Sequence, residues 1–310
     1  MQPIPLPIMT LDMPKHPKPT VIVYEVLIAP ESHTHTTGAV PLTIDNENPE
    51  WRELQAYTEI YRKGLFRNAD FVGVISPKFS NKAKIQFAEF VDFIQANPDC
   101  DVCFINPFPQ LAYWSLNVWM QGEHAHPGII GAAQRLLKAA QIPLELDVHL
   151  RHGEDILLYC NFWVGNEWFW ENYVGKILMP VVKLLESAQD LTTIDNILET
   201  THHTDPAPYL PFIIERLFST FLATTPDTQK AWWQHSLKEV QDDYCSNDFE
   251  RMLVSGMAHK INALGPTTGK WEDKAIAELD FLSSLFQRHF QDFYEHRPHP
   301  HTGRTFRPIY

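Results

Sequence analysis

The sequence predicts an α/β fold, with a mostly parallel central sheet. Apolar runs rich in β-branched and aromatic residues occur at 21–29, 70–76 and 101–106, and each is bounded by polar segments. Such runs are typical of buried strands. The segment 81–95 between two of them carries apolar residues at helical spacing. Strands that alternate with helices favour a single α/β layer arrangement with parallel strands.

The remaining elements continue this alternation. A short strand at 42–44 leads into an Asp-Asn turn, and a helix over 49–65 begins with Asn48 as its cap and Pro49 in its first turn. The later elements that we expect are helices over 110–119 and 127–140, a strand over 155–164, a long helix over 167–187 and a helix over 209–223.

No convincing strand follows residue 226, so the C-terminal part is expected to be helical. The chain then divides into four parts. They are a flexible, proline-rich lead-in at 1–19, an α/β domain at 20–225, a helical extension at 226–295 and an irregular tail at 296–310.

The overall charge excludes one class of partner. The 310 residues carry a formal net charge of −13, and nucleic-acid binding needs clustered lysine and arginine. No apolar run reaches the roughly 18–20 residues that span a bilayer, although a peripheral membrane contact stays open. The lead-in has no continuous apolar segment, so it is not interpreted as a secretory signal. We expect a cytoplasmic protein.

Four cysteines include a CxxC pair, Cys100 and Cys103. A redox pair of this type opens a helix, whereas Cys103 lies inside an expected strand. Redox and zinc roles are therefore disfavoured, and the four residues are interpreted as reduced, part-buried thiols.

Asp99-Cys100-Asp101 matches the Asp-x-Asp signature with which many sugar-nucleotide transferases hold Mn²⁺ or Mg²⁺. The pair precedes its strand, however, whereas ligand sites lie at the carboxyl ends of strands. At that end stands Asn106, which has no carboxylate. We therefore assign no metal ligand, and dependence on Mn²⁺ or Mg²⁺ is left open.

Polar residues at strand ends form the first candidate site. Ser76 and Lys78 follow the strand at 70–76, and Asp45 and Asn46 follow the strand at 42–44. Glu53 lies at the start of the next helix. Polar groups in an apolar framework at strand ends are how α/β enzymes present ligand-binding groups.

Two further groups of polar residues are candidates, each with a structural alternative. Gln121, Glu123 and His126 lie between two expected helices. Glu123 and His126 would act as acid, base or metal ligand, or the segment would simply be a capped loop.

Asn161 is a polar residue in an apolar strand, and it would hold a ligand hydroxyl or clamp the backbone locally. Glu215 and Arg216 lie inside an apolar helix. Because burial of an unpaired charge is costly, they are either paired with each other or face a cleft.

These blocks and their order resemble a group of bacterial glycosyltransferase-like domains encoded in capsule and lipopolysaccharide loci. The resemblance covers about residues 20–225. That group has an Asp-Asn turn before a helix opening Glu-Leu-Thr, then a basic-aromatic motif after a strand, an Asn-Met-Phe strand and a Glu-Arg-Leu helix. The matching segments here are Asp45-Asn46, Glu53-Leu54-Gln55, Lys78-Phe79, Asn161-Phe162-Trp163 and Glu215-Arg216-Leu217.

The resemblance implies a GT-A-like fold and a glycosyltransferase that moves a sugar from a nucleotide-sugar donor to a glycan acceptor, as in surface polysaccharide biosynthesis. Glu123 and Glu215 are the two candidate general bases. The residues expected to bind the donor or substrate are Asp45, Asn46, Glu53, Ser76, Lys78, Asn106, Gln121, His126, Asn161 and Arg216.

Two other functions stay open at this stage. A non-catalytic binding or scaffold protein would keep the transferase-like fold without its chemistry, as the missing Asp-x-Asp at the cleft suggests. A metal-dependent hydrolase built on the histidine clusters is the third hypothesis.

Overall fold

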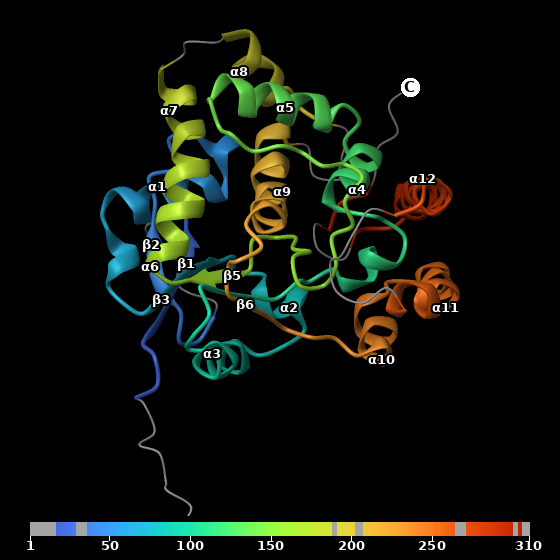
Figure 1. Cartoon of the computed structure of the whole chain (residues 1–310), viewed down its shortest axis with the longest axis horizontal. Helices are drawn as coiled ribbons and strands as arrows, with labels where there is room; N and C mark the ends of the chain where they lie inside the picture. Colours follow the sequence, from blue (N-terminus) through green and yellow to red (C-terminus); the bar gives the residue numbers. More distant parts are fainter. Residues whose placement is uncertain are drawn as a thin grey trace, which may run out of the picture.

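A central sheet with helices on both faces organises the structure, which is a computed structural model (Figure 1). It describes residues 17–28, 36–187, 191–201, 207–263, 271–299 and 303–305. Most of the expected lead-in and much of the expected C-terminal tail therefore lie outside the described residues.

The sheet is mixed, and its order within the described residues is β2-β1-β3-β5-β4-β6. In chain order the strands are β1 (Val21–Leu27), β2 (Val40–Thr43), β3 (Phe71–Ile75), β4 (Val102–Phe104), β5 (Trp163–Gly165) and β6 (Lys230–Trp232). The pairs β1–β2, β1–β3 and β4–β6 are parallel, whereas β5 runs antiparallel to both of its neighbours, β3 and β4. The α/β class is confirmed, and the expectation of a mostly parallel sheet gives way to a mixed one.

Helices form most of the remaining structure. The α-helices are α1 (Glu53–Arg62), α2 (Phe79–Ala83), α3 (Phe87–Gln95), α4 (Val118–Ala125), α5 (Ile129–Ala139), α6 (Glu167–Phe169), α7 (Met179–Ser187), α8 (Leu191–Leu198), α9 (Tyr209–Thr224), α10 (Leu237–Glu239), α11 (Asp248–Asn262) and α12 (Asp273–Glu295). Short 3₁₀ turns are η1 (Pro49–Trp51), η2 (Leu65–Arg67) and η3 (Pro109–Tyr113), and π-helical turns are η4 (Trp170–Leu178) and η5 (Val240–Tyr244).

Alternate residues of the strands enter two separate cores. On β4, Val102 and Phe104 join the larger core, and Cys103 on the opposite face joins the smaller one. The smaller core is closed by α2 and α3, through residues such as Phe79 and Phe90. The larger core is closed by α1, η4 and α9 on the other face of the sheet (Figure 1). Burial on both faces explains why the strands are continuously apolar.

Three expected elements are interrupted by residues with positive φ. Arg52 (φ 46°) separates η1 from α1 within the helix expected at 49–65, and Lys84 (φ 59°) separates α2 from α3. The strand expected at 155–164 is wrong except at its end, because Cys160 (φ 62°) and Asn161 (φ 55°) leave extended geometry just before β5. A left-handed conformation at a non-glycine residue interrupts a regular helix or strand.

The C-terminal part of the chain completes the sheet. The strand β6, which the sequence did not predict, pairs with β4, so the segment expected to be entirely helical also supplies a sheet edge. Val240, Leu253 and Leu279 belong to the larger core together with residues of the α/β part. In Figure 1, α10, α11 and α12 lie side by side at the right of the molecule. No helix in the described residues has the length and apolarity needed to cross a membrane.

Gly73 permits the close approach of β3 and β5. A Cβ atom at this position would lie 2.4 Å from the carbonyl oxygen of Trp163 and 2.7 Å from Cγ2 of Val164. The Gly73→Ala variant is expected to lose about 1–3 kcal/mol of unfolding free energy, because the backbones must separate. Urea denaturation followed by circular dichroism measures this loss.

The matched control is Gly256→Ala on α11, where no heavy atom lies within 4 Å of the added Cβ. This variant is expected to be neutral or to gain up to about 1 kcal/mol, since alanine favours helix. Equal denaturation midpoints for Gly73→Ala and the wild type would contradict the close packing of β3 on β5.

Candidate functional site

A cavity of about 730 Å³ opens at the carboxyl ends of β3 and β4. Its floor comes from residues that follow these strands, including Ser76 and Phe108, and from the segment that precedes β5. Helices α4 and α9 supply one wall, and α11, α12 and the segment after α12 supply the other. This volume lies within the usual 300–1,000 Å³ range of small-molecule sites, and the position matches the general rule for open α/β sheets.

The structure brings together most of the candidate residues that the sequence indicated. Those that line the cavity are Glu53, Ser76, Lys78, Gln121, His126, Asn161, Glu215 and Arg216. Those that do not line it are Asp45, Asn46, Asn106 and Glu123.

The Asp-Asn turn lies outside the cavity lining, and Asn46 makes a local hydrogen bond instead. Asp45 is exposed, and the Asn46 side-chain oxygen accepts a hydrogen bond from Gln55 Nε2 at 3.0 Å. Gln55 in turn accepts from the Asn48 backbone amide at 3.2 Å. The turn therefore fixes the entry to α1, and the expectation that it contacts a ligand is not supported by its position.

Glu123 caps a helix instead of facing the cavity. Its carboxylate accepts hydrogen bonds from the Gly128 and Ile130 amides at 2.7 and 3.2 Å, at the N-terminus of α5. A carboxylate is favourable there because of the helix dipole. The hypothesis of a catalytic Glu123 is thus corrected to the loop-capping alternative.

Asn106 also has a local role. Its side-chain oxygen accepts from the Phe108 amide at 3.1 Å, which closes the turn after β4.

Arg216 is anchored beneath the cavity by backbone and side-chain oxygens. Its guanidinium donates to the carbonyls of Val118 and Phe212 at 3.0 and 2.9 Å and to Gln121 Oε1 at 2.5 Å. The side chain is only 2% exposed, and burial lowers its pKa from the ordinary value. Gly122 makes room for it, since a Cβ there would lie 2.5 Å from Arg216 Nε. Arg216 therefore fixes α4 against α9.

Glu215 connects α9 to the segment before β5. Its Oε2 atom accepts a hydrogen bond from the Cys160 amide at 2.7 Å, and its Oε1 atom lies 3.5 Å from Arg216 Nη1. Burial raises the pKa of Glu215, against the opposing effects of Arg216, the Cys160 amide and Lys82. Its side chain is still 20% exposed, and it lines the cavity. The two alternatives for the Glu-Arg pair both hold, because the residues are paired and also line the cavity.

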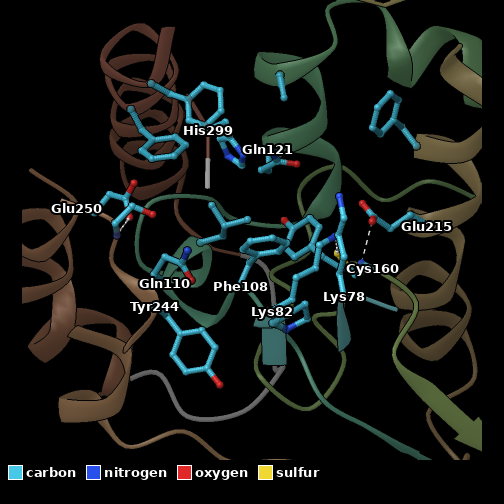
Figure 2. A pocket seen from close by; sticks show the side chains of 18 of the residues that line it. Lys78, Lys82, Phe108, Gln110, Gln121, Cys160, Glu215, Tyr244, Glu250 and His299 are labelled. Atoms are coloured by element: carbon cyan, nitrogen blue, oxygen red, sulfur yellow. Dashed lines mark hydrogen bonds between the residues drawn. The ribbon is translucent and has the colours of Figure 1, made fainter. Parts of the chain in front are cut away.

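Lys82 extends into the same region from α2. Its ammonium group donates to Cys160 Sγ at 3.1 Å. Burial lowers the pKa of Lys82, but Cys160, Glu215 and Glu53 outweigh this effect and raise the pKa overall. Burial raises the pKa of Cys160 to about 11, so at neutral pH the charged partners of Lys82 are the carboxylates. Figure 2 shows Lys78, Lys82, Cys160 and Glu215 gathered on one side of the cavity.

Four cations of the cavity lining come from residues 52–84, and we call them the cationic wall. They are Arg52, Lys78, Lys82 and Lys84. In a chain with a net charge of −13, such a concentration of positive charge gives the site a local potential that attracts anions.

Three side chains of the cavity lining contain buried polar atoms without a hydrogen-bond partner in the described residues. They are the Gln110 and Asn161 side-chain oxygens and the Tyr159 hydroxyl. An unmade hydrogen bond of this kind costs about 1–3 kcal/mol. Asn161 and its neighbour Cys160 also hold positive φ angles, and strained residues concentrate at binding sites. His126 lies nearby, stacked on Phe212 with ring centroids 3.8 Å apart.

Sequence reasoning missed several residues of the cavity. Lys82 lay within the helix expected at 81–95, and nothing in its spacing distinguished it from a solvent-exposed lysine. Cys160 was interpreted only as a part-buried thiol. The aromatic residues of α12 were assigned to a helical extension, and only the fold shows that they face the strand ends.

The Asp-x-Asp sequence lies at the opposite end of β4, as expected. Asp101 precedes β4 and accepts hydrogen bonds from Asn166 Nδ2 at 3.0 Å and from the Gln229 amide at 2.9 Å. Its carboxylate therefore joins β5 and β6 at that edge. No group of three or more His, Cys, Asp or Glu side chains suited to a metal ion occurs in the described part of the chain.

The part of the unfolding free energy that Glu250 on α11 contributes is expected to depend on pH. Burial raises its pKa to about 7, although the Ser246 amide donates to it at 2.7 Å. A raised pKa in the folded state contributes stability that is complete below the ordinary value of 4.5 and is lost as the pH rises through about 7. The unfolding free energy of the wild type should therefore fall across about pH 5–7, by up to about 1.4 kcal/mol per pH unit for this proton.

The Glu250→Gln variant is expected to remove this part of the pH dependence, because an amide does not titrate. Urea denaturation at a series of pH values measures it. Asp248→Asn, at an exposed position of the same helix, is the matched control and should keep the wild-type slope. Parallel pH profiles of Glu250→Gln and the wild type would contradict the raised pKa.

Comparison of this chain with known protein families, with curated proteins and with solved structures gave no match. The resemblance to bacterial glycosyltransferase-like domains stays a prediction.

Proposed function

We propose that the protein is a glycosyltransferase that moves a sugar from a nucleotide-sugar donor to a glycan acceptor. The observation that carries the proposal is the cavity at the strand ends, which joins a cationic wall to hydrogen-bonding groups and aromatic rings. A nucleotide-sugar has the complementary parts, since it combines a diphosphate with the hydroxyls of a sugar. The GT-A-like resemblance of residues 20–225 supports the same proposal.

The diphosphate is assigned to the cationic wall. Lys78 is exposed at the start of α2, and Lys82 lies one helical turn further, so both are on one side of the cavity (Figure 2). Two ammonium groups on the same side of the cavity suit a diphosphate, because charge-assisted hydrogen bonds to phosphate oxygens are stronger than neutral ones. They also stabilise the nucleoside diphosphate as it leaves.

The sugar is assigned to the space beside Asn161 and Tyr159. Their unpartnered polar atoms would gain hydrogen bonds from sugar hydroxyls when the side chains reorient on binding. Cys160 and Asn161 have positive φ angles, a strained backbone conformation that lowers the stability of the fold. Such strain is concentrated at binding sites, which supports the assignment of the sugar to this space.

Glu215 is assigned as the general base. An acceptor hydroxyl attacks the anomeric carbon, the bond from that carbon to the phosphate oxygen breaks, and the nucleoside diphosphate leaves with the electron pair. The hydroxyl proton passes to Glu215. A raised pKa suits this role, because it brings the carboxylate closer to the operating pH.

A binding protein without turnover is the alternative, and one observation favours it. Both oxygens of Glu215 already contact protein groups, the Cys160 amide and Arg216. A carboxylate held in this way fixes the cavity wall without taking up a proton. The two functions differ in turnover and agree on donor binding.

The Lys78→Ala and Lys82→Met variants test donor binding. Each is expected to weaken the binding of uridine, guanosine, cytidine or thymidine diphosphate, whichever the wild type binds, by about tenfold, the equivalent of one charged contact. Isothermal titration calorimetry measures the dissociation constants. Lys138→Ala, at an exposed position of α5 outside the cavity lining, should leave them unchanged. Unchanged affinity in both cavity variants would remove the diphosphate from the cationic wall.

The Glu215→Gln variant tests the assigned base. For the wild type, kcat/KM with a nucleotide-sugar should rise with pH through the raised pKa of Glu215, because only the deprotonated carboxylate accepts the proton. The variant should lose about 10²–10⁴-fold in rate together with this pH limb. Its amide oxygen still accepts the Cys160 hydrogen bond, so nucleotide affinity should persist. Donor binding without turnover in the wild type, whatever acceptor is supplied, would favour the binding protein.

A further inference from the structure

The wall of the cavity opposite the lysines is aromatic. Phe286, Phe290 and Phe293 project from successive turns of α12 and are only part-buried, and Tyr294 packs behind them. We call these four residues the aromatic wall. The ring centroids of Phe286 and Phe290 are 6.0 Å apart, and those of Phe290 and Tyr294 are 4.9 Å apart. The rings are tilted against one another, Arg297 lies over the Phe293 ring, and the His299 ring centroid is 5.6 Å from that of Phe290.

Polar groups are interleaved with these rings. Gln287 of α12, Gln110 of η3 and His299 also line the cavity. Gln110 has a side-chain oxygen without a partner in the described residues. Figure 2 shows Gln110 beside Phe108 and His299 above it. A site for an alkyl or prenyl chain has no use for such groups, because burying them without partners is costly.

The charge at this end differs from that of the cationic wall. Asp243 and Glu250 are the acidic residues here, and Arg297 lies over the Phe293 ring at 4.3 Å. Lys78 and Lys82 of the cationic wall lie on the other side of the cavity from Glu250 (Figure 2). This end therefore lacks the excess of positive charge that the cationic wall has, and a negatively charged ligand group gains no net attraction there.

We propose that the aromatic wall is the acceptor subsite and that it binds an uncharged glycan by stacking a pyranose ring on Phe290. The proposal rests on the proposed function, because it takes the cationic wall as the donor end. The C–H face of a pyranose ring is apolar and packs on an aromatic face. Its edge carries hydroxyls, which the interleaved glutamines and His299 receive.

The proposed donor and acceptor subsites lie at different ends of the cavity. The donor diphosphate lies at the end of β3, the acceptor ring lies on α12, and Glu215 is in the lining between α4 and the segment before β5. The acceptor class is thus an uncharged oligosaccharide, and the product is that oligosaccharide extended by one sugar.

Binding measurements on the full chain test this subsite without requiring turnover. The wild type is titrated with maltose, lactose and mannobiose as uncharged probes, with digalacturonate as the charged probe, and with the nucleoside diphosphate that it binds. The Phe290→Leu variant keeps an apolar side chain but removes the ring. It should weaken the binding of the uncharged disaccharide by about tenfold and leave nucleoside diphosphate affinity unchanged.

Three variants serve as comparisons. Phe281→Leu lies on α12 but is 62% exposed and outside the cavity lining, so it should bind every probe as the wild type does. Lys78→Ala should show the reverse pattern of Phe290→Leu, with weakened nucleotide binding only. Phe293→Leu provides a second cavity variant if Phe290→Leu fails to fold, and the same loss of disaccharide affinity is expected.

The outcomes separate this inference from the proposed function. Nucleotide binding without binding of any uncharged disaccharide would overturn the subsite and leave the transferase proposal standing. Tighter binding of digalacturonate would overturn the uncharged class. Equal weakening of nucleotide and disaccharide by Phe290→Leu would assign the ring to the nucleobase and also overturn the subsite. Failure of the wild type to bind any nucleoside diphosphate would instead remove the proposed function.

Discussion

The hydrogen bond from the Cys160 amide to Glu215 is the interaction on which the cavity depends. It joins α9 to a segment whose backbone holds two successive positive φ angles, at Cys160 and Asn161. Such a conformation persists only where surrounding contacts enforce it. Glu215 itself is held beside Arg216, whose guanidinium is fixed to the Val118 and Phe212 carbonyls. One chain of contacts therefore links α4, α9 and the start of β5.

Burial of charge is the constraint behind this arrangement. An arginine that is 2% exposed is costly unless its donors are satisfied, and Arg216 uses backbone carbonyls and Gln121 for this purpose. The arrangement leaves a carboxylate of raised pKa, Glu215, and the part-buried ammonium group of Lys82 at the edge of a cavity. Perturbed titratable groups in a cleft are features of functional sites, and the same contacts here also hold the fold together.

The sequence predicted those parts of the fold that depend on local patterns. The strand at 70–76 and the helix at 209–223 are continuous apolar segments, and β3 and α9 follow them closely. The breaks at Arg52, Lys84 and Cys160 were not predictable, because each is a non-glycine residue at positive φ that tertiary contacts enforce. The short strand β6 was missed since three residues carry too little pattern, and its stability comes from pairing with β4. Most candidate site residues lie together because the ends of neighbouring strands meet at one edge of the sheet. From the sequence alone Glu123 could not be distinguished from a catalytic acid, and only the structure shows that its carboxylate caps a helix.

The pairing of β6 with β4 has a consequence for biosynthesis. Residues 102–104 and 230–232 are neighbours in the sheet, although more than a hundred residues separate them in the chain. Contacts of such sequence separation form late, because a long loop must close first. The helices that supply the aromatic wall are made after β6. During translation the lysine-bearing part of the cavity therefore emerges from the ribosome well before its opposite wall. The two walls of the cavity are thus made at different times, and the cavity closes only after α12 has been synthesised and has packed against the α/β part.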